Sequence, residues 1–342
     1  MNSHFKRRYS KFKVTKFTKK ALVPKNSIVE LTNGCNHACV FCHNPEMKRK
    51  ISFLDLNVFE KFVKKAISEG VEEFGLYATG EPFFVKNLEE YISIAKKNGA
   101  KRVYCTSNGA LANIAKVKKC ILSGLDSIKF SINAGTADSY KIIHGFDDFD
   151  KVINNVKEIY EFKTKEAKNF QLLCGFVYTN LTKNEVEGFK KKYLKYFDDI
   201  EVHEAYNQGG RTLNKSKNLN SDFNKIKTKK HEPCEMLWNR LHLTAEGYLT
   251  ACCVDYENDL VYSKFENDKT LENQFNSGDM INLRLKHINN NLEGSICDGC
   301  IHNNNNTYSK LNKTEEKVSK INHLKVENLK ERIKKASKEI SN

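Results

Sequence analysis

Apolar positions along the chain follow two spacings, one typical of strands and one typical of helices. Residues 56–68 show the helical spacing, because their apolar side chains recur every three or four positions on one face. Short β-rich runs alternate with such segments, and we expect strands at 27–32, 73–78, 102–106, 127–132, 170–178 and 200–205. The helices expected between them span 56–68, 88–97, 113–122, 149–162 and 183–197.

This alternation predicts an α/β fold with a parallel sheet and right-handed crossovers. Six strands are fewer than the eight of a closed barrel, so we expect an open, partial (β/α)6 barrel of the TIM type over residues 27–207. In such architectures ligands bind at the carboxyl ends of the strands. The segments that follow each strand are therefore the first place to look for chemistry.

The rest of the chain divides by composition into four further segments. Residues 1–26 read as a basic N-terminal arm, and residues 208–233 as a polar linker rich in Gly, Asn and Lys. Residues 234–302 predict a small second domain, in which 241–252 alternate around Glu246-Gly247 as a β-hairpin does. Residues 303–342 predict a polar, charged helix or tail.

The formal charge of +15 lies mainly at the two ends of the chain. Residues 1–25 carry nine Lys or Arg and no Asp or Glu, and residues 301–342 carry ten Lys or Arg and five Asp or Glu. The remaining residues, 26–300, carry 38 basic and 37 acidic side chains. A nearly neutral body disfavours a nucleic-acid binder, which would interleave aromatic and basic residues along an exposed face. No apolar run is long enough for a membrane span, and no secretory signal is recognisable. With eleven cysteines read as metal ligands rather than disulfides, we expect a cytoplasmic protein.

Three cysteines follow the first expected strand: Cys35, Cys39 and Cys42. A [4Fe–4S] cluster takes four ligands, so three thiolates from one loop leave one iron open to an outside ligand. Zinc is the alternative at such short spacing, with His37 or His43 as the fourth ligand.

Small and polar residues recur where the later strands end. They are Thr79-Gly80-Glu81-Pro82, Ser107-Asn108-Gly109 and Ser131-Ile132-Asn133. Each alone is compatible with an ordinary turn. Their recurrence at successive strand ends indicates a ligand site.

The three cysteines, the aromatic Phe41 before the third of them and the Gly80-Glu81-Pro82 turn resemble the radical S-adenosylmethionine (SAM) enzymes over residues 27–205. The resemblance implies a cluster whose open iron binds SAM, which is cleaved reductively to a 5′-deoxyadenosyl radical. It also implies roles for the residues around SAM: Gly80 and Glu81 at the methionine amine, Ser131 and Asn133 at the ribose or carboxylate, Ser107 and Asn108 on the same rim, and Phe41 near the adenine. The family usually has two glycines before the Glu, and here Thr79 replaces the first.

A second set of cysteines lies in the small domain: Cys234, Cys252, Cys297 and Cys300. The set resembles the SPASM/twitch extension of radical SAM enzymes in its shorter form, which implies one auxiliary [4Fe–4S] cluster. Cys253 competes with Cys252 as the ligand, and structural zinc remains an alternative here.

The spacing of this set most resembles enzymes of the 2-deoxy-scyllo-inosamine dehydrogenase type. That resemblance implies an oxidoreductase that oxidises or epimerises a carbohydrate- or aminocyclitol-like alcohol, fed by a flavodoxin- or ferredoxin-type donor. A maturase that modifies a peptide or protein is the alternative. Candidate substrate residues at or beyond the sixth strand are His203, Glu204 and Arg211. A scaffold that only relays electrons is disfavoured, because it gains nothing from an open iron.

Overall fold

The computed structural model describes residues 4–212, 232–302 and 307–312. Nine strands form one sheet in the order β6-β5-β4-β3-β2-β1-β7-β8-β9. The first six strands are parallel: β1 Asn26–Val29, β2 Glu73–Gly75, β3 Arg102–Ser107, β4 Ser127–Ser131, β5 Gln171–Tyr178 and β6 Asp199–Glu204. Because β6 and β9 lie at opposite ends, the sheet is not closed. The predicted α/β fold with a partial barrel is confirmed.

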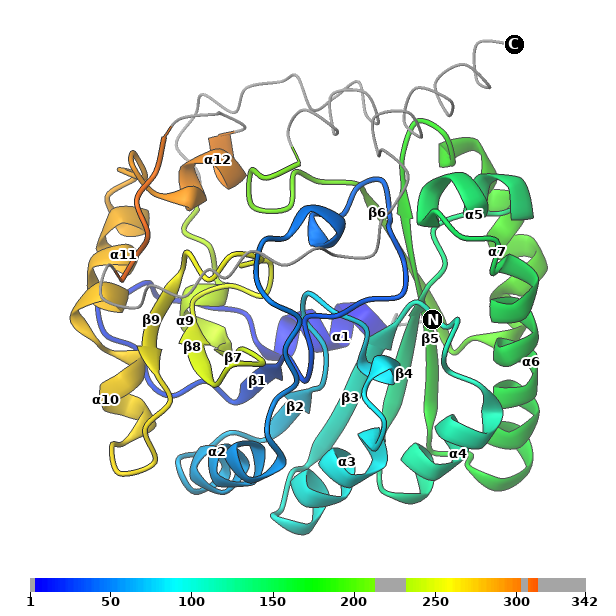
Figure 1. Ribbon diagram of the computed structural model, residues 1–342, viewed down its shortest axis with the longest axis horizontal. Helices are drawn as coiled ribbons and strands as arrows, with labels where there is room; N and C mark the ends of the chain where they lie inside the picture. The colour runs from blue at the N-terminus through cyan, green and yellow to red at the C-terminus, as the bar shows by residue number, and fades with distance from the viewer. Residues whose placement is uncertain (1–3, 213–231, 303–306, 313–342) are drawn as a thin grey trace.

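Helices return the chain between consecutive parallel strands and cover the outside of the sheet (Figure 1). They are α2 Leu56–Ser68, α3 Leu88–Lys97, α4 Ile114–Leu122, α5 Ala137–His144, α6 Phe149–Glu166 and α7 Val186–Tyr193. In α2, the Asp55 side chain caps the first turn by accepting from the amides of Asn57 and Val58. The buried face of α2 carries Phe59 and Phe62, as the helical spacing predicts.

Several details of the barrel differ from the sequence prediction. Strands β1 and β2 end at Val29 and Gly75, before the expected ends at 32 and 78. The helix expected at 183–197 is divided into the 3-10 turn η3 Lys183–Glu185, α7 and the 3-10 turn η4 Leu194–Tyr196. Helix α5 was not predicted. Two other 3-10 turns, η1 Asn44–Glu46 and η2 Pro82–Phe84, lie in the loops that follow β1 and β2.

The second cysteine-bearing segment extends the same sheet. Strand β7 Leu241–Leu243 pairs parallel with β1, and β8 Tyr248–Thr250 and β9 Val261–Lys264 follow antiparallel. The predicted hairpin is confirmed, with Gly247 at a φ of 82° in its turn. The helices of this segment are α9 Met236–Asn239, α10 Leu271–Phe275, α11 Gly278–Ile288 and α12 Ile296–His302.

The basic arm begins with a helix, α1 His4–Lys11, which the sequence did not predict. It lies at the amino ends of the strands, where the Arg8 guanidinium donates to Glu73 at 3.1 Å. Further along, the carbonyls of Phe12 and Thr18 accept from Asn239 and Trp238 at 2.9 and 2.8 Å. The arm thus connects the barrel to α9.

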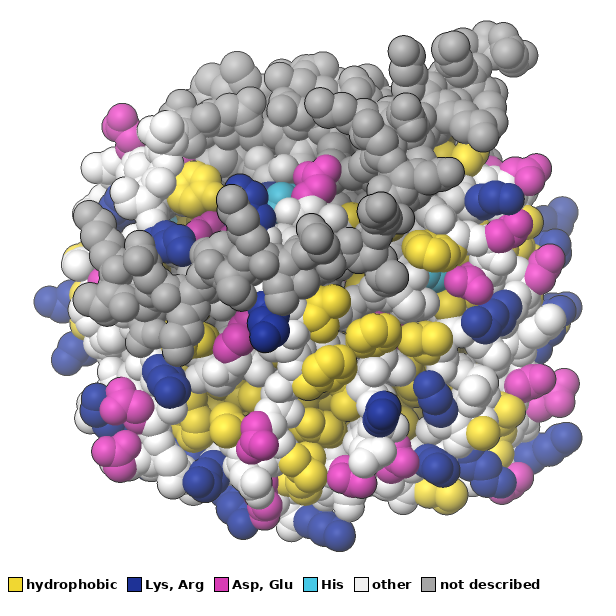
Figure 2. Space-filling model, in the orientation of Figure 1, with side chains coloured by type: hydrophobic (Ala, Val, Ile, Leu, Met, Phe, Trp, Pro, Cys, Tyr) yellow, Lys and Arg dark blue, Asp and Glu magenta, His cyan; other side chains and the backbone are white. Residues whose placement is uncertain are grey.

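Charged side chains of both signs are spread around the face shown in Figure 2, as the near-neutral composition of the body leads one to expect. No helix in the described ranges combines the length and apolar composition needed to cross a membrane. Most of the predicted linker (213–231) and of the predicted C-terminal helix or tail (303–306 and 313–342) lies outside the described residues.

Candidate active site

The first cysteine loop runs between β1 and α2 and is fixed against α5. The amides of Ala38 and Val40 donate to the carbonyls of His144 and Ile143 at 3.0 and 2.9 Å. Phe41 packs beside Val40 and Ile143. All eleven cysteines lie in the described ranges and are free thiols, so the reading of ligands rather than disulfides is compatible with the structure.

Hydrogen-bonding groups surround two sulfurs of this loop. Cys35 accepts from the His37 amide at 3.5 Å and from Asn108 Nδ2 at 3.8 Å. Cys42 accepts from the Asn44 amide at 3.4 Å. Donors of this kind stabilise ligating thiolates. The surroundings of these sulfurs therefore suit cysteine thiolates that ligate a metal or a cluster.

Burial raises the pKa of Cys35 to about 12. A buried thiol is therefore the stable form in the absence of a metal, because the charged form loses its hydration. Binding iron at this loop must release a proton from Cys35, as metal binding to cysteine does in general.

Two histidines lie beside the middle cysteine. The possible ligand atoms of His37, Cys39 and His144 all lie within 4.8 Å of one another. Burial lowers the pKa of His144 to about 3, so its ring is neutral. His43, the other proposed zinc ligand, instead lies 3.3 Å from the Glu257 carboxylate. His144 was missed by sequence reasoning because α5 was missed.

The turn after β2 packs tightly against the cysteine loop. A Cβ at Gly80 would lie 2.3 Å from the Thr32 carbonyl oxygen and 2.6 Å from that of Gly34, so the backbones approach as only glycine allows. Thr79 donates its hydroxyl to the buried Glu30 carboxylate. The Thr that replaces the family's first glycine thus has a side-chain partner of its own.

Glu81 connects this turn to the end of β3. Its carboxylate accepts from the Ser107 hydroxyl and the Asn108 amide, both at 2.8 Å, and from the Phe83 amide at 3.0 Å. Burial raises the pKa of Glu81 to about 7. Asn108 in turn reaches Cys35, so these three predicted residues lie together beside the first loop.

The residues expected after β4 lie on the same rim. Ser131 ends β4 and pairs with Gly175 of β5. Asn133 has a φ of 59°, its Oδ1 accepts from the Val177 amide at 2.8 Å, and its Nδ2 lies 3.4 Å from His144. Asn133 thereby connects the end of β4 to the histidine beside Cys39.

The second set of cysteines converges on one cavity of about 50 Å³. Its lining includes Cys234, Cys252, Cys297 and Cys300 together with apolar side chains such as Leu237, Leu260 and Ile296. Burial raises the pKa of Cys297 well above its usual value. Four thiols around one enclosed space fit a group bound entirely by cysteine.

Cys253 is absent from the lining of that cavity. Its sulfur lies 3.9 Å from the sulfur of Met236, which also lines the cavity. The side chains of Cys252 and Cys253 therefore face different surroundings, although both border a smaller space beside β7.

The three candidate substrate residues have different surroundings in the structure. His203 bonds to Glu201 in the same strand and is half exposed, and Glu204 ends β6 on the surface. Arg211 forms an ion pair with Asp259 of the second segment. The structure gives Arg211 a contact that joins the two parts of the chain, and its assignment to the substrate stays a prediction.

A cavity of about 150 Å³ lies within the barrel. Polar and charged side chains from neighbouring strands line it, among them Tyr77, Tyr104, Thr106, Lys129, Glu201 and Arg240. The arm contributes Phe5 and Arg8 at its wall. The interior thus offers hydroxyls, cations and one carboxylate to a small polar molecule.

The part of the chain that contains the first loop matches a known family. Residues 29–187 match the radical SAM superfamily. The chain is 27% identical over 285 residues to a Metallosphaera sedula protein named "Probable GTP 3′,8-cyclase", an alignment that covers 71% of this chain and 86% of the relative.

Two solved structures share the fold. BtrN in complex with AdoMet and 2-DOIA gives a TM-score of 0.54 at 14% identity, covering 85% of this chain and 97% of BtrN. SuiB of Streptococcus suis bound to the precursor peptide SuiA gives 0.59 at 13%, covering 81% and 68%. The predicted resemblance to the radical SAM enzymes is confirmed for residues 29–187, which match that superfamily.

Proposed function

We propose that this chain is a two-cluster radical SAM enzyme that acts on a small polar substrate inside the barrel. The observation that carries the proposal is the convergence of Cys234, Cys252, Cys297 and Cys300 on one cavity. A cluster with four cysteine ligands has no open iron, which suits electron transfer or a structural role. That leaves SAM cleavage to the first loop.

The first site has cysteines to bind a cluster and neighbouring residues to bind SAM. Cys35, Cys39 and Cys42 would bind the first [4Fe–4S] cluster, and the rim would bind SAM. That rim comprises Phe41, Gly80, Glu81, Ser107, Asn108, Ser131 and Asn133. When bound, the cluster and SAM supply a 5′-deoxyadenosyl radical that abstracts a hydrogen atom from the substrate. The carboxylate of Glu81, held by three donors, fixes the positions of Ser107 and Asn108 for that binding.

The substrate we favour is a carbohydrate- or aminocyclitol-like alcohol, oxidised or epimerised at a carbinol carbon. Tyr77, Tyr104 and Thr106 line the barrel cavity with hydroxyl groups, which exchange hydrogen bonds with substrate hydroxyls. The volume of about 150 Å³ suits a small molecule better than a folded peptide segment. BtrN, whose fold this chain shares, is bound to 2-DOIA as well as to AdoMet in its solved complex.

A second candidate is chemistry on a purine nucleotide. The relative from M. sedula carries the name of a GTP cyclase. Arg102, Lys129 and Arg240 border the barrel cavity, and cations of this kind bind phosphate. Peptide modification is a third outcome that the assay below distinguishes, since SuiB is bound to a precursor peptide in its solved complex.

A flavodoxin- or ferredoxin-type protein would supply the electrons. A cytoplasmic location would keep the eleven free thiols reduced. Both remain proposals that follow from the cluster chemistry.

The test is anaerobic SAM cleavage by the reconstituted protein with dithionite. We expect 5′-deoxyadenosine from the wild type and from Cys120→Ala, a matched control because Cys120 is buried in α4. We expect none from the variant with Cys35, Cys39 and Cys42 changed to Ala. Cleavage that survives the triple substitution would show that another site binds SAM.

The substrate class is read from the transfer of deuterium into 5′-deoxyadenosine. An aminocyclitol deuterated at its carbinol carbons and GTP deuterated at C3′ serve as the two probes. Transfer from the aminocyclitol supports the alcohol proposal, and transfer from GTP replaces it with the nucleotide candidate. If deuterium is transferred from neither probe but is transferred from a deuterated peptide fraction, the enzyme is assigned to peptide modification.

A further inference from the structure

A loop of the second segment reaches back to the first cysteine loop. Residues 252–259 begin at Cys252, and four positions later the Tyr256 hydroxyl lies 3.4 Å from the Cys42 sulfur. The next residue, Glu257, accepts from the Lys48 amide at 2.9 and 3.1 Å and lies 3.3 Å from His43. The two loops are therefore docked against each other by several polar contacts.

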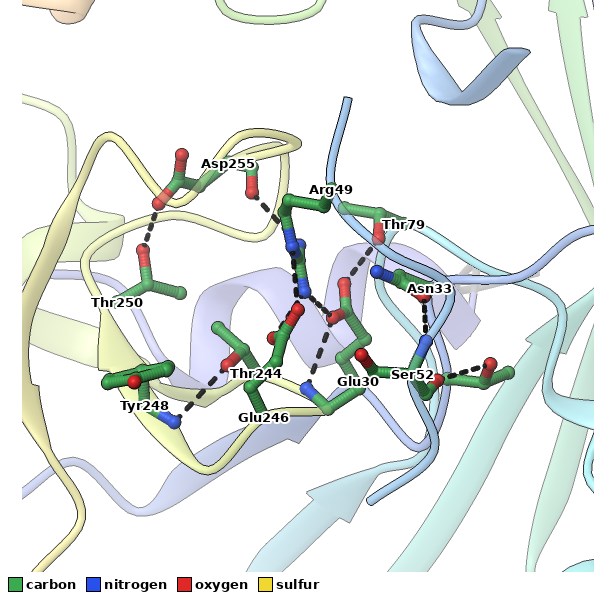
Figure 3. Close-up of polar contacts among 12 residues, drawn as sticks. Glu30, Asn33, Arg49, Ser52, Thr79, Thr244, Glu246, Tyr248, Thr250 and Asp255 are labelled. Carbon is green, nitrogen blue, oxygen red and sulfur yellow. Dashed lines mark hydrogen bonds and ion pairs between the residues drawn. The ribbon is translucent and has the colours of Figure 1, made fainter. Parts of the chain in front are cut away.

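The Arg49 side chain adds an anchor to the same docking. Its guanidinium contacts the Asp255 carbonyl at 3.5 Å and pairs with Glu246 of the β7–β8 turn (Figure 3). Tyr256 thus stands on a loop that is held from both sides.

The hydroxyl is enclosed by protein. Tyr256 is 4% exposed, its ring lies edge-on to His43 at 5.5 Å, and its hydroxyl donates to Gln208 Oε1 at 2.7 Å. A tyrosine side chain ordinarily has a pKa of about 10, so Tyr256 is a neutral O–H group at neutral pH.

The direction of the hydrogen bond follows from the state of the sulfur. A thiolate bound to iron carries no proton and can only accept, so the Tyr256 O–H must be the donor. The Tyr256 hydroxyl has a single proton, which points to Gln208 Oε1 while Cys42 is a thiol. When that proton is donated to an iron-bound Cys42, the Gln208 amide turns over and donates its N–H to the tyrosine oxygen instead. Hydrogen bonds to ligating sulfur stabilise the reduced cluster and raise its reduction potential.

We propose that Tyr256 is a positioning residue that sets the reduction potential of the first cluster by donating a hydrogen bond to Cys42. The inference rests on the proposed function, because it requires a cluster at Cys35, Cys39 and Cys42.

The experiment compares Tyr256→Phe with Tyr262→Phe in the anaerobically reconstituted full chain. Tyr262 is a matched control, since it is buried in β9 and its hydroxyl has no hydrogen-bond partner among the described residues. Iron content is measured first, and the midpoint potential of the first cluster is then measured by a redox titration followed by electron paramagnetic resonance.

We expect full iron in both variants, a more negative midpoint in Tyr256→Phe and a wild-type midpoint in Tyr262→Phe. A wild-type midpoint in Tyr256→Phe with full iron overturns this inference alone. Absence of iron from the wild type overturns the proposed function as well.

If Tyr256→Phe loses iron, its midpoint cannot be compared with that of the wild type. A second variant covers that case. 3-Fluorotyrosine placed at position 256 keeps the size of the side chain and is a stronger hydrogen-bond donor. It should move the midpoint in the positive direction. An unchanged midpoint in that variant would also contradict the proposal.

Discussion

Arg49 and Glu246 form a two-pronged ion pair although 197 positions separate them in the sequence. The Arg49 Nε lies 3.0 Å from one carboxylate oxygen of Glu246, and an outer nitrogen lies 2.6 Å from the other. The same outer nitrogen lies 2.6 Å from Glu30 at the end of β1 (Figure 3). One buried guanidinium thereby joins the first cysteine loop, the barrel and the second segment.

Arg49→Met should destabilise the fold by about 3–5 kcal/mol, because it leaves a buried carboxylate without its cation. Glu30 is 3% exposed, so water cannot take the place of the guanidinium. The measurement is urea unfolding followed by circular dichroism. Lys64→Met is the control: its ion pair with Glu60 is exposed on α2, and we expect a loss below about 1 kcal/mol. Equal losses in the two variants would contradict the role of Arg49.

The contribution of the Arg49–Glu30 ion pair to the free energy of unfolding should depend on pH. Burial is the largest single influence and raises the pKa of Glu30, but the charge of Arg49 and the hydrogen bonds from Arg49, Thr79 and the Ala245 amide together outweigh it, and the pKa lies below its usual value of 4.5. A lowered folded-state pKa gives stability that is present above the unfolded value and is lost as the pH falls through the folded one. The difference in unfolding free energy between wild type and Arg49→Met should therefore be largest near neutral pH and shrink below about pH 4.5. A difference that grows with acidity would be inconsistent with an ionised Glu30.

Gly80→Ala should destabilise the protein by about 1–3 kcal/mol or more, because the new methyl group would overlap two backbone oxygens. It should also lower the rate of 5′-deoxyadenosine formation, since it moves the cysteine loop. Gly188→Ala is the control in α7, where an added Cβ meets nothing within 4 Å. There alanine should stabilise the helix by about 0.5–1 kcal/mol. A neutral Gly80→Ala would mean that the two loops are not in close contact.

Cys252→Ser and Cys253→Ser should differ in iron content after reconstitution. Cys252 lines the cavity shared by the other three cysteines, so its loss should remove about four irons per chain. Cys253→Ser should keep the wild-type iron content, because Cys253 does not line that cavity. The reverse result would transfer the ligand assignment to Cys253.

Local patterns predicted the regular part of the fold well. The bounds of α2 (Leu56–Ser68) and α3 (Leu88–Lys97) match the sequence prediction, because each helix carries one continuous apolar face and defined end signals. Helix α5 is shorter, and its signals lie at its ends rather than in its apolar spacing. Thr136 forms a capping box with Ser139, and Gly145 ends the helix at a φ of 78°.

Long-range contacts explain what could not be predicted. Arg49 is a single cation in a loop, and its partners Glu30 and Glu246 form no local pattern with it. The arm is held through backbone carbonyls such as that of Thr18, which any sequence would present. Tyr256 belongs to the same class, because its contact with Cys42 spans 214 positions. The first cysteine set was accessible from its short intervals, and the second from its resemblance to the SPASM/twitch extension.

The central claim is that the chain binds two [4Fe–4S] clusters. The most direct test is iron and sulfide analysis with Mössbauer spectroscopy after anaerobic reconstitution, on the wild type and on a variant with Cys234, Cys252, Cys297 and Cys300 changed to Ala. We predict about eight irons per chain in the wild type and about four in the variant, both as [4Fe–4S] clusters. About four irons in the wild type, or zinc in place of iron at the second set, would contradict the two-cluster account.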